Sequence, residues 1–261
     1  FAAPAPYHDM YSIDDAPADG WLSLAVAELE SLPDVTLMRR TTVFGTYDHG
    51  TYGAVERVSD HVPVPSAHHP RQRVWRIVAR RAVLCAGAVE RPLVFGGNDL
   101  PGVMMGSAVR AYANRFGVAA GRKVVVATSN DDGLRTADDL RALGVEVAAV
   151  IDTRDGSELS RGHGRQRLRA IEFIDKLGRK HNVECDVLAM SNGWNPTLHQ
   201  STHLGGKPAW SDAAMAFVPA QTPRGMTVAG AAAGHFLLCE ALADGFSMGG
   251  QAATDCGFSP K

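Results

Sequence analysis

Two apolar stretches with an amphipathic stretch between them are the clearest pattern in the chain. Residues 123–128 and 145–152 are mostly Val and Ala, and residues 132–143 place apolar residues at helical spacing before Gly144. Unbroken apolar runs of this kind are typical of strands buried on both faces, as in parallel sheets. The pattern predicts a β-α-β unit in an α/β fold, its two strands being parallel neighbours joined by a right-handed crossover.

Shorter patterns predict further strands and helices. The strands at residues 42–47 and 52–58 should form a hairpin around Asp48-His49-Gly50. Residues 155–164 should be a short polar connection, and residues 1–20, rich in Pro, Asp and Ala, a linker. The remaining strands are expected over residues 35–39, 73–79, 82–85, 168–174, 183–190 and 226–230, and helices over 21–32, 107–116 and 235–246.

Composition excludes several classes of protein. The net charge of −2 gives no electrostatic reason to expect nucleic acid or an anionic membrane as a partner, and no apolar run reaches the roughly 18 residues of a membrane span. The four cysteines are scattered and form no CxxC pair, so we expect no metal cluster and a reducing, cytoplasmic location. Because the chain starts with Phe1 rather than Met, we expect it to be a piece of a longer protein.

The turn at residues 128–133 stands where a dinucleotide fold binds pyrophosphate. The usual fingerprint is G-x-G-x-x-G, but here only Gly133 is glycine, and Asp131 and Asp132 would repel a nearby phosphate. Ser129 or Asn130 can cap the following helix. The spacing alone therefore leaves open a working nicotinamide nucleotide site or a retained fold without its ligand.

Asp152 ends the second strand of this unit, where an acceptor for ribose hydroxyls belongs. The alternative is an ordinary solvated aspartate at a strand end. Arg154 beside it could instead contact a 2′-phosphate, so NAD is only favoured over NADP.

Small residues form two further turns after strands. They are Cys85-Ala86-Gly87-Ala88 and the stretch from Gly230-Ala231 to Gly234. Only small residues allow a backbone to approach a flat cofactor closely, although tight packing of a helix on a sheet selects them too.

The stretch in which Cys85-Ala86-Gly87-Ala88 precedes Glu90-Arg91-Pro92 resembles the alpha subunit of heterotetrameric sarcosine oxidase. That subunit is a flavoprotein of the FAD/NAD(P)-binding, Rossmann-like class also called the pyridine nucleotide-disulfide oxidoreductase type. Opine and proline oxidase subunits and the flavin subunit of hydrogen cyanide synthase share parts of the pattern. The resemblance extends over residues 20–250 and is carried by residues 41–45, 47–49, 56–58, 71–73, 75–77, 123–131, 185–196 and 228–234.

The resemblance implies a domain plan and two cofactors. Residues 21–105 would be part of an FAD-binding domain with a β-rich insert, 106–200 a shortened NAD-binding domain, and 201–261 a return to the FAD-binding domain. By resemblance, Ser191 to Pro196 would line the nicotinamide pocket, although Asn-Pro alone signals a plain turn. FAD would be bound by Val43, Ala86, Gly87, Ala88, Gly230 and Ala231, and NAD by Ser129, Asn130, Asp152, Gly193 and Trp194.

The same resemblance implies a division of labour among subunits. The chain would act with beta, gamma and delta subunits, and FMN on the beta subunit would oxidise an N-methyl amino acid. We expect no catalytic residue and no metal ligand in this chain, because a lone loop histidine such as His49 is more often structural. The alternative is a non-catalytic remnant or interaction subunit, since the FAD-gripping G-x-G-x-x-G and the family's ferredoxin-like and folate-binding segments are missing.

Overall fold

The computed structural model describes residues 12–13 and 16–259, so most of the predicted linker at residues 1–20 lies outside the described residues. The chain divides into two compact units. Unit 1 is taken here as Glu90–Trp194, and unit 2 as the described residues on either side of it. We predicted domain boundaries at residues 105 and 200. Unit 1 begins at Glu90, and residues 103–105 form a strand within its sheet.

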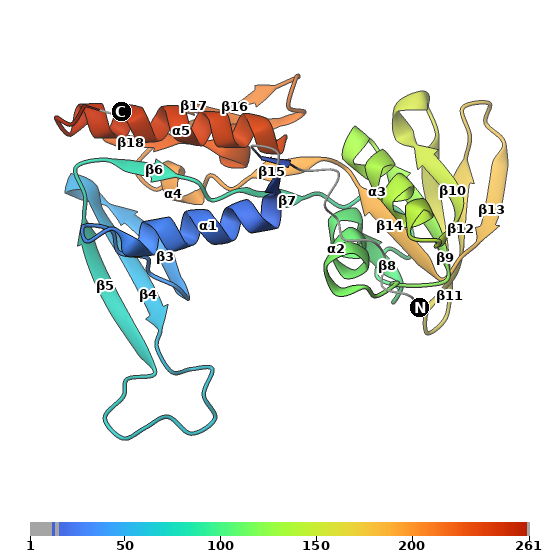
Figure 1. Ribbon diagram of the computed structural model, residues 1–261. Coiled ribbons are helices and arrows are strands. Elements are labelled where there is room, and N and C mark those ends of the chain that lie inside the picture. The colour runs from blue at the N-terminus through green and yellow to red at the C-terminus, as the bar shows by residue number, and fades with distance from the viewer. Residues whose placement is uncertain (1–11, 14–15, 260–261) are drawn as a thin grey trace. The chain divides into compact units, whose positions relative to one another are not determined.

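Unit 1 is built on a four-stranded parallel sheet (Figure 1). Its strands lie in the order β10 (Glu146–Asp152), β9 (Lys123–Thr128), β14 (Val187–Ser191) and β8 (Val103–Met105), and every neighbouring pair is parallel. Helix α3 (Asp131–Ala142) joins β9 to β10. The predicted β-α-β unit with parallel neighbouring strands is therefore confirmed.

The two faces of this sheet bury separate apolar cores. Helices α2 (Gly106–Phe116) and α3 cover one face, where Val109 and Leu140 pack on alternate residues of the strands. The other face packs against Leu168 and Ile171. Because successive side chains of a strand point to opposite faces, Val124 and Val126 belong to the first core and Val125 and Ala127 to the second.

The second face is covered by a three-stranded antiparallel sheet. Its strands are β11 (Glu158–Gly164), β12 (Leu168–Ile174) and β13 (Lys180–Glu184), in that order. The polar connection expected at residues 155–164 was wrong, because Leu159 is buried in the core and brings this segment into the sheet. The single strand expected at residues 183–190 is instead divided between β13 and β14. Between these two strands, the Asp186 carboxylate accepts hydrogen bonds from the backbone amides of Arg122 and Lys123.

Unit 2 contains the predicted hairpin within an antiparallel sheet. The sheet runs β3 (Thr41–Tyr47), β4 (Thr51–Arg57) and β5 (Gln72–Val78), with a 3-10 turn at Asp48–Gly50. His49 adopts a φ of 59° in this turn. The long loop between β4 and β5 projects beyond the strands (Figure 1). Residues 35–39 form no strand, and their apolar Val35 and Leu37 are exposed.

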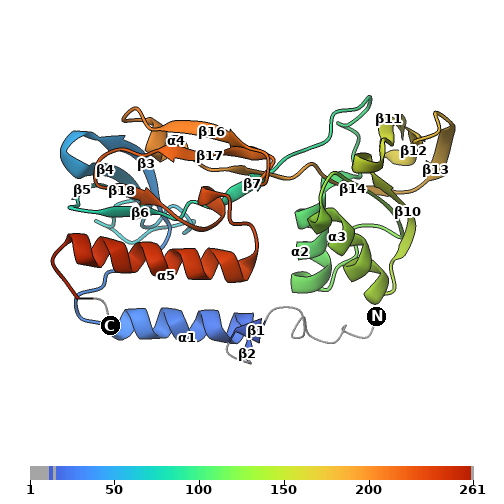
Figure 2. The same cartoon turned by 90° about the horizontal axis from the view of Figure 1, so that it is seen from above.

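The rest of unit 2 has little apolar packing of its own. Strand β6 (Ala82–Leu84) pairs in parallel with β18 (Met226–Val228), and the 3-10 turn η3 (Gly230–Ala233) follows β18. Helix α5 (Leu238–Asp255) packs beside β6 and η3 (Figure 2) but buries no residue. The other elements are β1 (Ser12–Ile13), β2 (Ala16–Pro17), α1 (Ala18–Ser31), α4 (His199–Thr202), β16 (Lys207–Ser211) and β17 (Ala216–Gln221).

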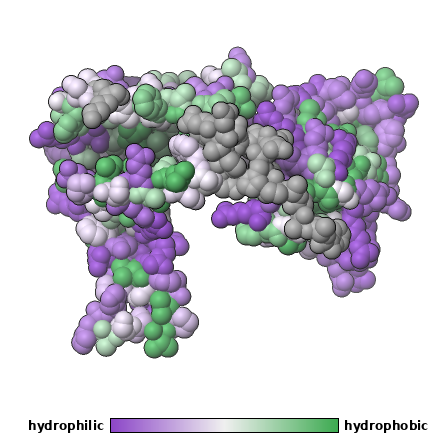
Figure 3. Space-filling model, in the orientation of Figure 1, coloured by the Kyte–Doolittle hydropathy of each residue, from purple (hydrophilic) through white to green (hydrophobic). Residues whose placement is uncertain are grey.

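Apolar side chains are accordingly exposed on unit 2. Leu22 and Leu24 of α1 are 59% and 71% exposed, and Phe246 of α5 is 81% exposed. Figure 3 shows apolar residues on the surface of this unit, including the loop between β4 and β5, where Val64 is exposed. The helical pattern at residues 21–32 and at 235–246 thus predicted helices correctly, although several apolar side chains of both helices stay exposed among the described residues.

Candidate nucleotide-binding site

The turn between β9 and α3 is held by its own hydrogen bonds. The Asn130 side chain caps α3 by accepting the Gly133 amide at 3.1 Å, and the Thr128 hydroxyl accepts the Asn130 amide at 3.0 Å. A Cβ added at Gly133 would lie 2.1 Å from the Thr128 hydroxyl oxygen. Gly133 is therefore required for the close approach of helix and strand, which is the part of the dinucleotide fingerprint that this chain retains.

A second turn, after β14, is bonded to the first. The Ser129 amide donates to the Ser191 carbonyl at 3.0 Å, and the Ser129 hydroxyl donates to the Asn192 side chain at 2.9 Å. The Asn130 side chain also donates to the Ser191 hydroxyl at 3.1 Å. The two turns lie together at the carboxyl ends of β9 and β14, but the side chains of Ser129 and Asn130 are already bonded within the protein.

Arg91 supports this second turn and Glu90 the start of α2, roles that the sequence pattern did not reveal. The Arg91 guanidinium donates to the Asn192 carbonyl at 2.9 Å, and the Arg91 amide donates to the Gly193 carbonyl at 2.8 Å. Gly193 has a φ of 83°, and a Cβ there would lie 2.8 Å from the Arg91 guanidinium. The buried Glu90 carboxylate accepts the amide and hydroxyl of Ser107 at the start of α2.

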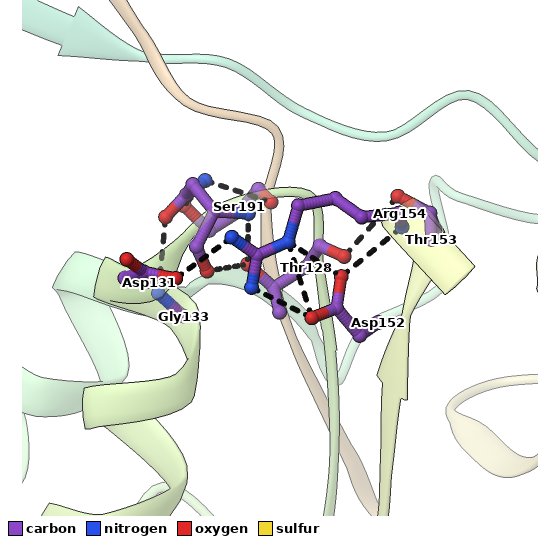
Figure 4. Close-up of polar contacts among 8 residues, drawn as sticks. Thr128, Asp131, Gly133, Asp152, Thr153, Arg154 and Ser191 are labelled. Atoms are coloured by element: carbon purple, nitrogen blue, oxygen red, sulfur yellow. Dashed lines mark hydrogen bonds and ion pairs between the residues drawn. The ribbon is translucent and has the colours of Figure 1, made fainter.

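Arg154 connects the start of α3 with the end of β10 (Figure 4). It lies in the 3-10 turn Thr153–Asp155 that follows β10. Its guanidinium donates to Asp131 at 2.7 Å, and also to both carboxylate oxygens of Asp152, the shortest of these distances being 2.7 Å. The predicted ribose acceptor is thus paired with a cation that also holds the first residue of the helix.

The charges of this cluster shift one another's titration. The hydrogen bond from Arg154 holds the pKa of the Asp152 carboxyl below its usual range. The hydrogen bonds that Arg154 donates to Asp152, and then to Asp131, raise the pKa of its guanidinium. The Asp152 carboxyl is therefore ionised and the Arg154 guanidinium protonated at neutral pH.

The residues around the first turn fit an adenine dinucleotide in part. The first amides of a helix have no partner inside it, and Asn130 satisfies only that of Gly133. Asp152 stands at the end of the neighbouring parallel strand, with its side chain 26% exposed. These groups suit a pyrophosphate and a ribose, whereas Asp131 brings a carboxylate to the place where phosphate would bind.

The predicted flavin residues follow two neighbouring parallel strands of unit 2. Ala86, Gly87 and Ala88 come after β6, and Gly230 and Ala231 come after β18, so both turns lie at the same edge. Gly87 has a φ of 71°, and an added Cβ would meet no atom within 4 Å. The structure places Val43 elsewhere, on β3 of the antiparallel sheet.

The backbone amide of Gly230, one of the predicted flavin residues, already has a partner. It donates to the Asp244 carboxylate of α5 at 2.8 Å. Burial, and then the charge of Asp244, raise the pKa of the nearby Cys85 thiol. His49 is exposed to solvent. It lies in the 3-10 turn that follows the C-terminal end of β3.

The fold is of a known class. Solved structures with a similar fold include L-proline dehydrogenase from P. horikoshii, with a TM-score of 0.72 at 20% identity over 99% of this chain and 48% of that chain. Another is T. acidophilum thioredoxin reductase, with a TM-score of 0.57 at 11% identity over 94% of this chain and 82% of that chain. The chain thus has the FAD/NAD(P)-binding, Rossmann-like fold of pyridine nucleotide-disulfide oxidoreductases, as the sequence predicted.

Sequence comparison points to one particular protein within that class. The chain is 43% identical to sarcosine oxidase subunit alpha of Rhizobium meliloti (strain 1021) over 251 residues, which are 91% of this chain and 25% of that protein. It is 38% identical to the same subunit of Corynebacterium sp. (strain P-1), over 94% of this chain and 28% of that protein. The resemblance to the sarcosine oxidase alpha subunit is confirmed, and the chain spans about a quarter of these relatives.

Two further comparisons complete the description. No protein-family model matches the chain. Among the described residues, no helix is long and apolar enough to cross a membrane.

Proposed function

We propose that the chain is the nucleotide-binding part of a sarcosine oxidase-type oxidoreductase subunit, with FAD held by unit 2 and NAD by unit 1. The similarity to two subunits of that name, over more than nine tenths of the chain, supports this proposal. FAD supplies the redox chemistry when bound, while the residues of the chain bind and orient it. The fragment alone is expected to be inactive.

The wider role of the protein follows from the names of its relatives. A subunit called alpha implies a multi-subunit enzyme, and beta, gamma and delta subunits are the expected partners. The beta subunit, with FMN, would oxidise an N-methyl amino acid such as sarcosine. The same subunit of an opine or proline oxidase, or of hydrogen cyanide synthase, is the alternative within this class.

The observation that carries the flavin proposal is the turn at Gly87. This glycine combines a left-handed backbone with open space on the side where a Cβ would stand. Since the fold itself does not fill that space, a planar cofactor can approach the backbone there. The small residues that follow β18 at the same edge extend the approach.

A matched pair of substitutions in the full-length protein tests the flavin proposal. Gly87→Val should lower the flavin absorbance per mole of purified protein severalfold, because the branched side chain strains the backbone and enters the cofactor's space. Gly178→Val in unit 1 is the control, since Gly178 has a similar φ of 76° and equally open surroundings. Full flavin content in the Gly87 variant, or equal loss in both, would show that the cofactor is not at this turn.

The non-catalytic alternative also has an observation in its favour. Ser129, Asn130 and Asp152 are bonded within the protein, as expected for a dinucleotide fold kept without its ligand. Purified protein that contains no flavin and takes up neither FAD nor NAD would support that alternative and exclude our proposal.

A further inference from the structure

Arg154 bridges the two elements between which the dinucleotide is proposed to bind. It reaches from the turn after β10 to the first residue of α3, in contact with both Asp152 and Asp131 (Figure 4). Its side chain is 44% exposed, and that of Asp131 is 74% exposed. The Arg154–Asp131 pair is therefore a solvent-exposed ion pair, which is weak and easily exchanged.

The two contacts of Arg154 are unequal. Asp152 receives three hydrogen bonds from the guanidinium and one more from the Arg154 backbone amide, which fixes this pair within a single tight turn. Asp131 receives one hydrogen bond, across 23 residues of sequence. An incoming anion would therefore displace Asp131 and leave Arg154 anchored on Asp152.

Asp131 also competes with a phosphate for the helix. It is the first residue of α3, where the unpartnered amides attract anions. A phosphate at the start of this helix would be repelled by the Asp131 carboxylate. A cation that pairs with the carboxylate or with the phosphate would relieve this repulsion.

We infer that Arg154 is the pyrophosphate-binding cation of this site, exchanging the Asp131 carboxylate for a phosphate of NAD. This inference rests on the proposed binding of NAD by unit 1. It explains how a turn with one glycine and two aspartates can accept a dinucleotide. Arginine suits the exchange because its planar fork binds carboxylate and phosphate oxygens alike.

Isothermal titration of NAD into the purified protein and its variants tests the exchange. Arg154→Gln should weaken NAD binding by about tenfold, since it removes a charge-assisted hydrogen bond to phosphate. Asp131→Asn should leave the affinity unchanged or raise it by a few fold, because the competing carboxylate is gone. The double variant should bind NAD more tightly than Arg154→Gln alone.

Two controls separate the exchange from other causes. Arg141→Gln removes the same charge from an exposed ion pair at the opposite end of α3, where Arg141 pairs with Asp138 at 3.0 Å. It should bind NAD like the parent. Arg154→Lys keeps the charge but not the planar guanidinium, so its affinity for NAD should be intermediate. If Arg154→Gln is poorly folded, Arg154→Lys serves as the second variant, and its melting temperature verifies that it is folded.

The possible outcomes are distinguishable. Parent protein that does not bind NAD overturns both the proposed function of unit 1 and this inference. Parent that binds NAD, with Arg154→Gln and Arg154→Lys binding as tightly or more tightly, overturns only the inference. Equal weakening by Arg154→Gln and Arg141→Gln also overturns it, because net charge and not the position of Arg154 would then be responsible.

Discussion

The two units of this chain differ most in how far each buries its own apolar surface. In unit 1 both faces of the parallel sheet are covered, and Leu140, Ile151, Leu168 and Leu188 are almost fully buried. Among the described residues of unit 2, the buried apolar cluster is small and consists of Leu198, Val228 and Ala232, with partly buried Leu84 and Ala233 beside it. Unit 1 therefore carries its stability within itself, whereas unit 2 leaves apolar surface uncovered.

The parallel pair β6–β18 illustrates the difference. Parallel strands are normally buried within larger sheets, and a two-stranded sheet is marginal alone. Helix α5 beside it exposes Leu238 and Phe246, and the chain spans about a quarter of its relatives. Exposed apolar patches of this kind usually mark contact surfaces.

Truncation of a leucine should give the largest difference in stability loss between the two units. Leu188 is fully buried in unit 1, so Leu188→Ala should lower the free energy of unfolding of that unit by about 2–5 kcal/mol. Leu24→Ala in α1 should change the stability of unit 2 by less than about 0.5 kcal/mol, because Leu24 is 71% exposed. Urea denaturation followed by hydrogen exchange of each unit measures both effects, and comparable losses would contradict the contrast.

Glycine-to-alanine substitutions should act with opposite sign in the two units. At Gly133 the new methyl group would collide with Thr128, and unit 1 should lose about 1–3 kcal/mol. At Gly249, inside α5 and with no atom within 4 Å, the same change should stabilise the helix by about 0.5–1 kcal/mol. Thermal melts of the two variants give the signs, and a neutral Gly133→Ala would show that helix and strand are not so closely packed.

Thiol labelling should show the smallest difference between the two units, but it reports on single residues. Burial, and then the Asp186 charge, raise the pKa of the Cys185 thiol in unit 1 to about 11. Since the neutral thiol is favoured in the folded state, its contribution to stability is complete below the unfolded pKa and is lost as pH rises toward about 11. At pH 8, Cys239 in unit 2 should react quickly because it is exposed, and Cys185 only when unit 1 opens. Equal rates would contradict this.

Unit 1 was also the part best predicted from the sequence. Residues 123–128 and 168–174 were predicted as strands with the observed bounds, because both are rich in apolar residues and are bounded by polar segments. The strand at 158–164 was missed, since Arg161, His163 and glycines interrupt its apolar pattern. Only the burial of Leu159 against a distant sheet makes this segment a strand, and such tertiary contacts are not visible in local pattern.

The candidate sites could be predicted only as positions along the chain. Ser129, Asn130, Asp152 and Gly193 were expected near the ends of parallel strands, and the structure places them there. Their hydrogen-bond partners could not be predicted, because Arg154 and Asp131 are 23 residues apart and meet only in the folded unit.

Hydrogen exchange of the protein with and without NAD tests the central claim most directly, because it reports which unit the nucleotide contacts. The account predicts slower exchange at the amides of residues 131–133, 152–154 and 191–194 in unit 1, with no change around Gly87 and Gly230 in unit 2. Protection confined to the turns of unit 2, or no protection at an NAD concentration that saturates the protein, would contradict the assignment of the dinucleotide to unit 1.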